Sequence, residues 1–406
     1  MGLRIGVCGA GSFARSFIPL FQGHPLVEEV ALAEVLPERL AEQAARFGIR
    51  ETYPDLDALC ASGVDAIALL TQRHLHGPQA LQALGAGKHV YSAVPMGVTL
   101  DELRAIVRAV EETGLTYMMG ETSYYYPSTV LCRERFRRGE FGAFVYGEGE
   151  YYHDMSHGFY EAYQHSGGAE WKRVAGFPPM LYPSHSVSMV LSVTGARMTQ
   201  VSCLGYVDRH DDGVFGAGNN LWDNPYSNET ALFRTSDGGM CRINEFRRVG
   251  VSGGRSVRLS LYGTEAAYEE QADGEVWVTR DKRQEDLRPL LACAPSIHPA
   301  REDLPPDLRE DFHSGLAPVH ARERLPEAFR LLPNGHHGSH QFLVDDFVRA
   351  VTEGRLAPNH AWAAARYCAP GIVAHESALQ EGRILEVPDL GDPPTTWRLL
   401  EGPDGA

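Results

Sequence analysis

The sequence predicts a doubly wound α/β domain followed by an α+β domain with a large open, mostly antiparallel sheet. Over residues 1–120, short apolar strands alternate with amphipathic helices. Strands separated by helices of about 10–15 residues form right-handed crossovers in a parallel sheet. From about residue 140, one strand-like run follows another, and many end in glycine-containing turns, which is typical of antiparallel sheets. Helical patterns at 339–353 and 361–380 close the chain.

The individual elements follow from the same periodicities. Strands of the first domain are expected at 4–8, 29–33, 66–70, 89–92 and 116–120, and helices at 12–22, 37–47, 56–61, 78–86 and 100–113. Strands of the second domain are expected at 145–152, 197–206, 228–235, 239–247, 256–262 and 267–271, with a helix at 186–193. The stretch 283–333 is rich in Pro, Asp and Arg, which predicts a long loop or insertion. We therefore expect domains at 1–122 and 123–406.

Composition narrows the class of protein. The 406 residues include 37 Lys plus Arg and 53 Asp plus Glu, a formal net charge of −16, so we expect no nucleic-acid partner. No apolar run approaches the roughly 20 residues of a bilayer span, so we expect no membrane partner. Seven cysteines without a Cys-x-x-Cys pair indicate a reducing compartment. With a strand-like run at the N-terminus instead of a signal peptide, the expected location is cytoplasmic.

A glycine-rich turn between the first strand and the first helix predicts a dinucleotide site. Residues 9–14 follow the pattern GxGxxA. Gly9 permits the tight turn, Gly11 lets the backbone approach a pyrophosphate, and Ala14 lets helix and strand pack closely. Glu34 ends the second strand, where it accepts hydrogen bonds from the adenosine ribose and repels a 2′-phosphate. The expected fold is a Rossmann domain and the expected cofactor is NAD, bound also by Ser12 and Phe13 of the turn.

Residues 66–76 and 87–96, together with this turn, resemble the Gfo/Idh/MocA family, the glucose–fructose oxidoreductase and inositol dehydrogenase relatives. Residues 261–269 look like the late Gly-Thr strand of that family. The resemblance implies a Rossmann domain plus an open-faced sheet domain, a sugar or cyclitol substrate, and a homo-oligomer, either dimer or tetramer. It also implies further cofactor contacts, which are Thr71, Arg73, His76, Ala93 and Pro95.

One position departs from that family. Its dehydrogenases usually carry Glu-Lys-Pro where this chain has Ala93-Val94-Pro95. The family's lysine assists proton transfer from the substrate hydroxyl as hydride leaves, and Val94 has no group that can do so. Of the three lysines in the chain, only Lys172 is a candidate to reach the substrate. The sequence therefore disfavours a lysine-driven alcohol dehydrogenase.

The family's second catalytic motif is also altered. Tyr182-Pro183-Ser184-His185 stands where many relatives have Asp-x-Gly-x-His before a helix. This pattern resembles a smaller branch, the NAD-dependent glycoside hydrolases that act on terminal N-acetylgalactosamine. The resemblance implies oxidation at carbon 3, elimination of the group on carbon 1, addition of water and return of the hydride. His185 fits general acid–base catalysis, and Tyr182 is a phenol partner if NAD⁺ or a neighbouring cation lowers its pKa.

Two polar clusters are candidate substrate contacts. The run 151–157 ends a strand, and its Tyr152, His153 and His157 suit sugar stacking and hydroxyl contacts. The run 334–340 begins a helix and resembles a Gly-His-Gly-Gly segment of the hydrolase branch, with His336 and His337 as candidates. Helix capping and a solvated loop are the alternatives for these clusters. The spacing of the histidines is not a recognised metal motif, so no metal site is predicted.

Three functions remain open at this level. The first is a redox-neutral, NAD-dependent enzyme acting on a glycoside or sugar derivative. The second is a net NAD-dependent dehydrogenase of a sugar or cyclitol, with His185 as the base in place of lysine. The third is a non-catalytic NAD-binding sensor. A Tyr182/His185 pair at the expected site favours the enzymes over the sensor.

Overall fold

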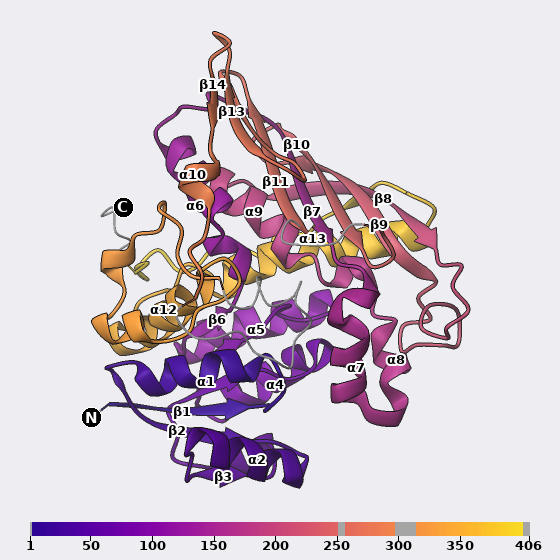
Figure 1. Ribbon diagram of the computed structural model, residues 1–406. Helices are drawn as coiled ribbons and strands as arrows, with labels where there is room; N and C mark the ends of the chain where they lie inside the picture. The colour runs from indigo at the N-terminus through magenta and orange to yellow at the C-terminus, as the bar shows by residue number, and fades with distance from the viewer. Residues whose placement is uncertain (1, 251–255, 297–313, 401–406) are drawn as a thin grey trace.

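The computed structural model describes residues 2–250, 256–296 and 314–400 (Figure 1). Its first sheet contains β1 (Leu3–Cys8), β2 (Val27–Ala33), β3 (Thr52–Tyr53), β4 (Ala66–Leu69), β5 (His89–Ser92) and β6 (Tyr117–Met119). All neighbouring pairs are parallel, in the order β3-β2-β1-β4-β5-β6. The order reverses between β1 and β4, and ligands of such sheets bind at the carboxyl ends of the strands there. The predicted Rossmann domain is confirmed.

Helices connect these strands on both faces. They are α1 (Ala14–Gly23), α2 (Pro37–Phe47), α3 (Leu56–Cys60), α4 (His76–Gly85) and α5 (Leu100–Thr113), with the short helical turns η1 (Arg73–Leu75) and η2 (Thr122–Tyr125). Capping residues define where these helices begin and end. Thr99 caps α5 by accepting a hydrogen bond from the Glu102 amide at 3.2 Å, and Gly114 ends this helix in the left-handed region at φ 69°. The predicted boundary at residue 122 falls in η2.

The second sheet has nine strands, in the order β14-β13-β12-β11-β7-β10-β9-β8-β15. They are β7 (Phe144–Tyr152), β8 (Met198–Val207), β9 (Tyr226–Thr235), β10 (Met240–Phe246), β11 (Val257–Gly263), β12 (Ala266–Glu270), β13 (Glu275–Thr279), β14 (Gln284–Asp286) and β15 (Leu385–Glu386). Only β7 and β10 pair in parallel within the described residues, so the sheet is mostly antiparallel, as predicted.

Helices of the second domain lie on one side of this sheet, towards the first domain (Figure 1). The longer ones are α6 (Pro127–Arg137), α7 (Tyr160–Gly167), α9 (Ser184–Thr194), α12 (Ser339–Glu353) and α13 (Ala361–Leu379), and α8 (Trp171–Ala175) and α10 (Arg288–Leu291) are short. Single helical turns are η3 (Met155–Phe159), η4 (Gly168–Glu170), η5 (Pro179–Leu181), η6 (Arg322–Arg324) and η7 (Glu327–Leu331). Helix α9 packs so closely on β7 that a Cβ on Gly149 would lie 2.3 Å from the Ser186 carbonyl oxygen.

Two expectations need correction. The stretch 283–333 is not one long loop, because β14, α10, η6 and η7 lie in it, and its residues 297–313 are outside the described part. In addition, β3, β13 and β15 were not expected, and β15 has only two residues. Its hydrophobic pattern is too short to show alternation, so only pairing with β8 defines it.

Helix α12, in the last part of the second domain, packs on the first domain beside α1 (Figure 1). Phe342 and Phe347 of α12 share one apolar core with Phe17, Phe21 and Tyr91, and the Phe347 ring lies 5.6 Å from the Tyr91 ring. The last quarter of the chain therefore completes the core beneath the cofactor sheet. Among the described helices, none combines the length and the apolar composition that crossing a bilayer requires.

Candidate active site

The glycine-rich turn has the backbone that the sequence predicts. Gly9 has φ 94°, and a Cβ there would lie 2.5 Å from the Leu70 carbonyl oxygen, so this position accepts only glycine. Gly11 has no atom within 4 Å of its Cβ position, which leaves room for a ligand against its backbone. Ser12 lies in the turn itself, and buried Ala14 begins α1. The free amides of this helix end favour a pyrophosphate.

Glu34 lies at the carboxyl end of β2, facing the same turn. Its Oε2 accepts a hydrogen bond from the Ala10 amide at 2.9 Å, and its Oε1 accepts one from the Leu36 amide at 3.1 Å. These bonds fix the carboxylate while leaving lone pairs for the ribose hydroxyls. The open space over Gly11 and this fixed carboxylate together fit NAD.

The carboxyl ends of β4 and β5 are tied together by His76. Its ring lies 3.2 Å from the Thr71 carbonyl oxygen and 3.0 Å from that of Pro95, and burial lowers its pKa to about 4. The Ala93 amide donates to Leu69 at 2.9 Å, and the Val94–Pro95 peptide bond is cis. His76 is thus a neutral, buried residue that positions the two loops beside the cofactor turn.

The predicted acid–base pair is present and includes a third member. The Nε2 of His185, at the start of α9, lies 3.3 Å from the Tyr182 hydroxyl. Its Nδ1 lies 2.6 Å from Oε1 of Glu121, which follows β6 and is fully buried. A carboxylate at Nδ1 places the proton on that nitrogen, so Nε2 is the acceptor for the Tyr182 hydroxyl. Oε2 of Glu121 has no partner among the described residues.

Two opposing effects act on the pKa of Tyr182. Arg73 and Arg247 lower it, as expected of neighbouring cations, but burial raises it by more. Without NAD⁺ the phenol is therefore neutral at pH 7 and donates its proton to His185. A neutral phenol accepts a substrate proton only while it passes its own proton on to His185.

Arg73 was predicted to contact the cofactor, but its side chain extends towards Tyr182. The guanidinium lies 4.5 Å from the Tyr182 ring centre and donates a hydrogen bond to the Tyr163 hydroxyl. Tyr163 belongs to α7, which lies over this side of the site.

The structure brings together some of the predicted substrate residues. His153 lies against the rings of Phe159, at 4.0 Å, and Tyr151, at 5.5 Å. Burial is the largest of the causes that lower the pKa of His153 and of His336 well below the usual range, and both rings also interact electrostatically with His185. Both imidazoles are therefore neutral and lie close to His185.

The 334–340 segment also reaches the cofactor turn. The Phe13 ring lies 5.7 Å from His336 and 5.8 Å from His340, and these two histidines face each other with Nδ1 and Nε2 2.8 Å apart. His337 lies 4.6 Å from the Tyr126 ring. This segment therefore bridges the glycine turn and the acid–base group.

Two other predicted residues lie apart from this cluster. Tyr152 lies on the other face of β7, where its hydroxyl accepts a hydrogen bond from Asn244 at 3.0 Å, and Lys172 is exposed on α8. His157 is half-buried in η3 and interacts electrostatically with His153. Adjacent side chains of a strand point to opposite faces, which is why Tyr151, and not Tyr152, faces His185 at 5.3 Å.

Sequence reasoning missed several residues of this cluster, which are Glu121, Tyr151, Glu245 and Arg247. Glu121 had a usable signal, because it follows β6 just as Thr71 and Ala93 follow their strands, and carboxyl ends of parallel strands share one edge. Arg247 follows β10, whose neighbour β7 ends beside the site, a pairing that the sequence does not reveal. Within the described residues, no three His, Cys, Asp or Glu side chains gather as a metal site.

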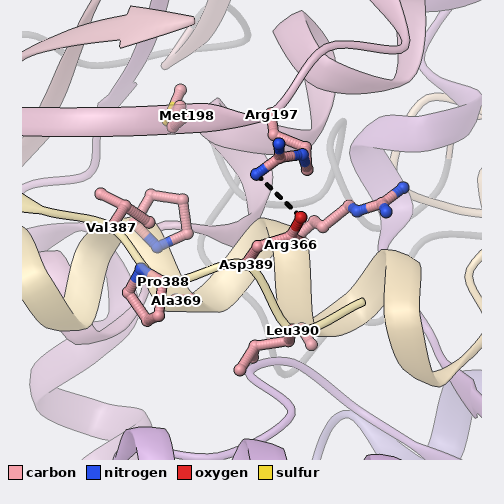
Figure 2. Close-up of a pocket in the computed structure, with 10 residues that line it drawn as sticks. Arg197, Met198, Arg366, Ala369, Val387, Pro388, Asp389 and Leu390 are labelled. Carbon is pink, nitrogen blue, oxygen red and sulfur yellow. Dashed lines mark ion pairs between the residues drawn. The ribbon is translucent and has the colours of Figure 1, made fainter. Parts of the chain in front are cut away.

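A separate hollow lies between the start of β8, α13 and residues 387–390 (Figure 2). Its charges are already paired, since Arg197 contacts Asp389 at 3.1 Å and Arg366 contacts Asp392. The remaining lining is largely apolar, with Met198, Val387 and Leu390. This hollow offers no acid–base pair, and the candidate site remains the His185 cluster.

Comparison with known proteins agrees with the fold of the first domain. Residues 3–121 match the model of the oxidoreductase family with an NAD-binding Rossmann fold, Gfo/Idh/MocA. The first domain is of the Gfo/Idh/MocA type. This NAD-binding fold supports NAD as the cofactor of an NAD-dependent enzyme. The sensor alternative is not supported.

The proteins that this chain resembles are named for different activities. A glycosyl hydrolase family 109 protein of Streptomyces niveus is 25% identical over 412 residues, covering 96% of this chain and 77% of that protein. The trans-1,2-dihydrobenzene-1,2-diol dehydrogenase of Mus musculus is 31% identical over 160 residues, covering 39% of this chain and 48% of that protein. Levoglucosan dehydrogenase with NADH and levoglucosan has the same fold, with TM-score 0.70, 18% identity, and coverage of 96% and 100%.

Proposed function

We propose that this oxidoreductase cleaves a sugar glycoside without net redox, by hydride transfer at carbon 3 followed by elimination and hydrolysis. The observation that carries the proposal is the buried chain Tyr182–His185–Glu121 beside a loop where Val94 replaces the family's lysine. The Streptomyces niveus relative, named a glycosyl hydrolase family 109 protein, matches 96% of the chain. That match supports a glycoside substrate.

The chain's own residues supply the proton transfers. When bound, NAD accepts the hydride from carbon 3 and returns it at the end, so no external oxidant is consumed. Tyr182 takes the proton of the carbon 3 hydroxyl while its own proton passes to Nε2 of His185. Glu121 stabilises the resulting imidazolium through Nδ1, as charge-assisted hydrogen bonds do.

The second stage needs another acid–base group. A carbonyl at carbon 3 acidifies the proton on carbon 2, and a base removes that proton as the group on carbon 1 leaves. The neutral imidazoles of His153 and His336 fit this role, because both lie close to His185 and are uncharged. Water then adds across the double bond between carbons 1 and 2, so the balance is glycoside plus water to sugar plus alcohol.

A net dehydrogenase of a sugar or cyclitol is the second candidate. It is favoured by the names of relatives that include dihydrodiol and levoglucosan dehydrogenases. In this case the same Tyr182–His185 pair removes the hydroxyl proton, and NADH leaves as a product. The two candidates share the oxidation at the start and differ in whether elimination and return of the hydride come after it.

The deciding experiment measures aglycone release from aryl glycosides by purified protein, with and without NAD⁺, while NADH absorbance is followed. We expect release that needs NAD⁺, leaves no lasting NADH and, in D₂O, places deuterium on carbon 2 of the product. Removing the base with His185→Ala should lower kcat at least about 100-fold, and Glu121→Gln about 10- to 100-fold.

The matched control is His210→Ala, which removes an exposed imidazole that contacts Asp208 away from the site and should leave kcat unchanged. Lasting NADH without aglycone release would contradict the hydrolase and support the dehydrogenase. If the protein binds NAD but shows neither aglycone release nor NADH formation, both candidates are contradicted.

A further inference from the structure

Arg73 holds a positive charge among aromatic rings at the candidate site. Its guanidinium lies 4.5 Å from the ring centre of Tyr182, 4.9 Å from that of Phe159 and 5.2 Å from that of Tyr163. Its polar contacts are tyrosine hydroxyls, those of Tyr163 and Tyr182. These rings form an aromatic wall around one charged group.

Among the described residues, no carboxylate forms an ion pair with Arg73. The largest charge interactions of its guanidinium are with Tyr163, Tyr182 and Tyr151. Arginine stays protonated in proteins, and a half-buried charge is unfavourable unless a counter-charge or strong hydrogen bonds compensate it. A guanidinium held this way beside a proton-transfer pair is a binding group for an anion.

The second arginine of the site adds to the positive charge. Arg247 lies 5.7 Å from the ring of Phe159 and 6.0 Å from that of Tyr182, so it shares two rings with Arg73. Its partner is Glu245, at 3.1 Å. Burial raises the pKa of Glu245 to about 8, more than Arg247 lowers it, so Glu245 is largely protonated at pH 7. The carboxylate of Glu121 is engaged by His185.

We propose that the substrate is an acidic sugar, whose carboxylate Arg73 binds next to Tyr182. This inference rests on the proposed function, which places a carbohydrate at this site, and adds the chemical class, a uronic acid or its glycoside. The geometry of Arg73 suits it, because a guanidinium binds a planar carboxylate through two parallel hydrogen bonds.

A carboxylate fits better than a phosphate ester. Arg247 stays hydrogen-bonded to Glu245, so Arg73 is the guanidinium without a carboxyl partner among the described residues. One such group matches a single negative charge, whereas a phosphate monoester carries nearly two near pH 7. The sugar ring would lie against the aromatic wall of Phe159, Tyr163 and Tyr182. A ligand can reach Arg73 because Arg73 itself and its neighbours His153 and Tyr163 are half-buried and not fully enclosed.

Equilibrium binding to the NAD-loaded full-length protein tests the inference. The probes are matched pairs that differ only at carbon 6, methyl glucuronide against methyl glucoside and methyl galacturonide against methyl galactoside, with glucose 6-phosphate as a third class. We expect at least about tenfold tighter binding of one acid than of its neutral partner. Arg73→Gln should remove this ratio, and Arg73→Lys should retain part of it.

Arg248→Gln is the matched control, because Arg248 is adjacent in sequence to Arg247 but paired with Asp208 and Asp212. It should leave the acid-to-neutral ratio unchanged. Retained NAD binding shows that each variant is folded, and the partial loss in Arg73→Lys gives a reading even if Arg73→Gln fails to fold.

Several results would overturn the inference. They are equal binding of acid and neutral sugars, binding of neither, tighter binding of the phosphate, or an acid preference that survives in the Arg73 variants. An acid preference that depends on Arg73, without any turnover of the bound sugar, would instead leave this inference standing and contradict the proposed function.

Discussion

At the scale of one residue, burial changes the protonation state of Glu245. It is fully buried in β10, hydrogen-bonded by the Ser186 hydroxyl and 3.1 Å from the Arg247 guanidinium. Burial raises its pKa to about 8 from the ordinary 4.5, although Arg247 lowers it. Between these two pH values the folded protein holds a proton that the unfolded chain has lost. Stability therefore declines as the pH rises through this window.

Glu245→Gln should remove this pH dependence. Because glutamine has the same shape without a titrating group, the free energy of unfolding of wild type relative to the variant should decline by up to about 1.4 kcal/mol per pH unit between pH 6.5 and 8. Urea unfolding at four pH values measures it. His76, His320 and His360, whose pKa values burial lowers to about 4 in the folded protein, are present in both proteins and cancel in the difference. Parallel curves for the two proteins would contradict the prediction.

At the scale of the element, two glycines of the turn between β1 and α1 have different roles, one in folding and one in cofactor binding. Gly9 and Gly11 are two residues apart and look equivalent in the sequence. In the structure, Gly9 has positive φ and a backbone oxygen in the place of a side chain, whereas Gly11 has empty space around its Cβ position. The first glycine is needed by the turn, and the second by the ligand.

Substitution by alanine should separate these two roles. Gly9→Ala should lower the Tm of the protein without cofactor by several degrees, because it adds left-handed strain and a contact of 2.5 Å with Leu70. Gly11→Ala should leave that Tm unchanged but weaken NAD binding at least tenfold. Thermal unfolding and NAD titration measure both. An equal loss of Tm in the two variants would show that Gly11 also has a structural role.

Elements with a strong hydrophobic periodicity were predictable. Elements held mainly by contacts with other parts of the chain were not. The strands ending at Cys8, Ala33 and Ser92 were all placed to within two residues at both ends, because buried parallel strands are continuous apolar runs. In contrast, α7 is polar and has no buried side chain. Contacts such as that from Arg39 to the His165 carbonyl oxygen, at 2.7 Å, hold it instead.

At the scale of the whole molecule, the site joins residues from distant parts of the chain. Arg73 follows β4, Glu121 follows β6, His185 begins α9, and His336 precedes α12. The motifs predicted Tyr182 and His185 because they are adjacent in the sequence and carry a recognisable pattern. Glu121 had a weaker signal, its place just after β6. Arg247 joins the site through the pairing of β10 with β7, which the local sequence does not reveal.

The open face of the second sheet is the other feature of the whole molecule. On it, Leu204, Leu232 and Met240 are 63%, 58% and 54% exposed, on the neighbouring strands β8, β9 and β10. Alternate residues of the same strands, such as Cys203 and Phe233, are buried under the helices. Apolar side chains gathered on one flat face favour association, because burying them removes apolar surface from water.

We therefore expect a dimer or tetramer formed through this face. Leu204→Glu combined with Leu232→Glu should reduce the mass in sedimentation velocity to that of a monomer, since a carboxylate buried against a second sheet would have no counter-charge. Leu331→Glu, at a 75% exposed position of η7, is the control and should leave the mass unchanged. The prediction fails if the wild-type protein sediments as a monomer, or if the double variant stays associated while remaining folded and able to bind NAD.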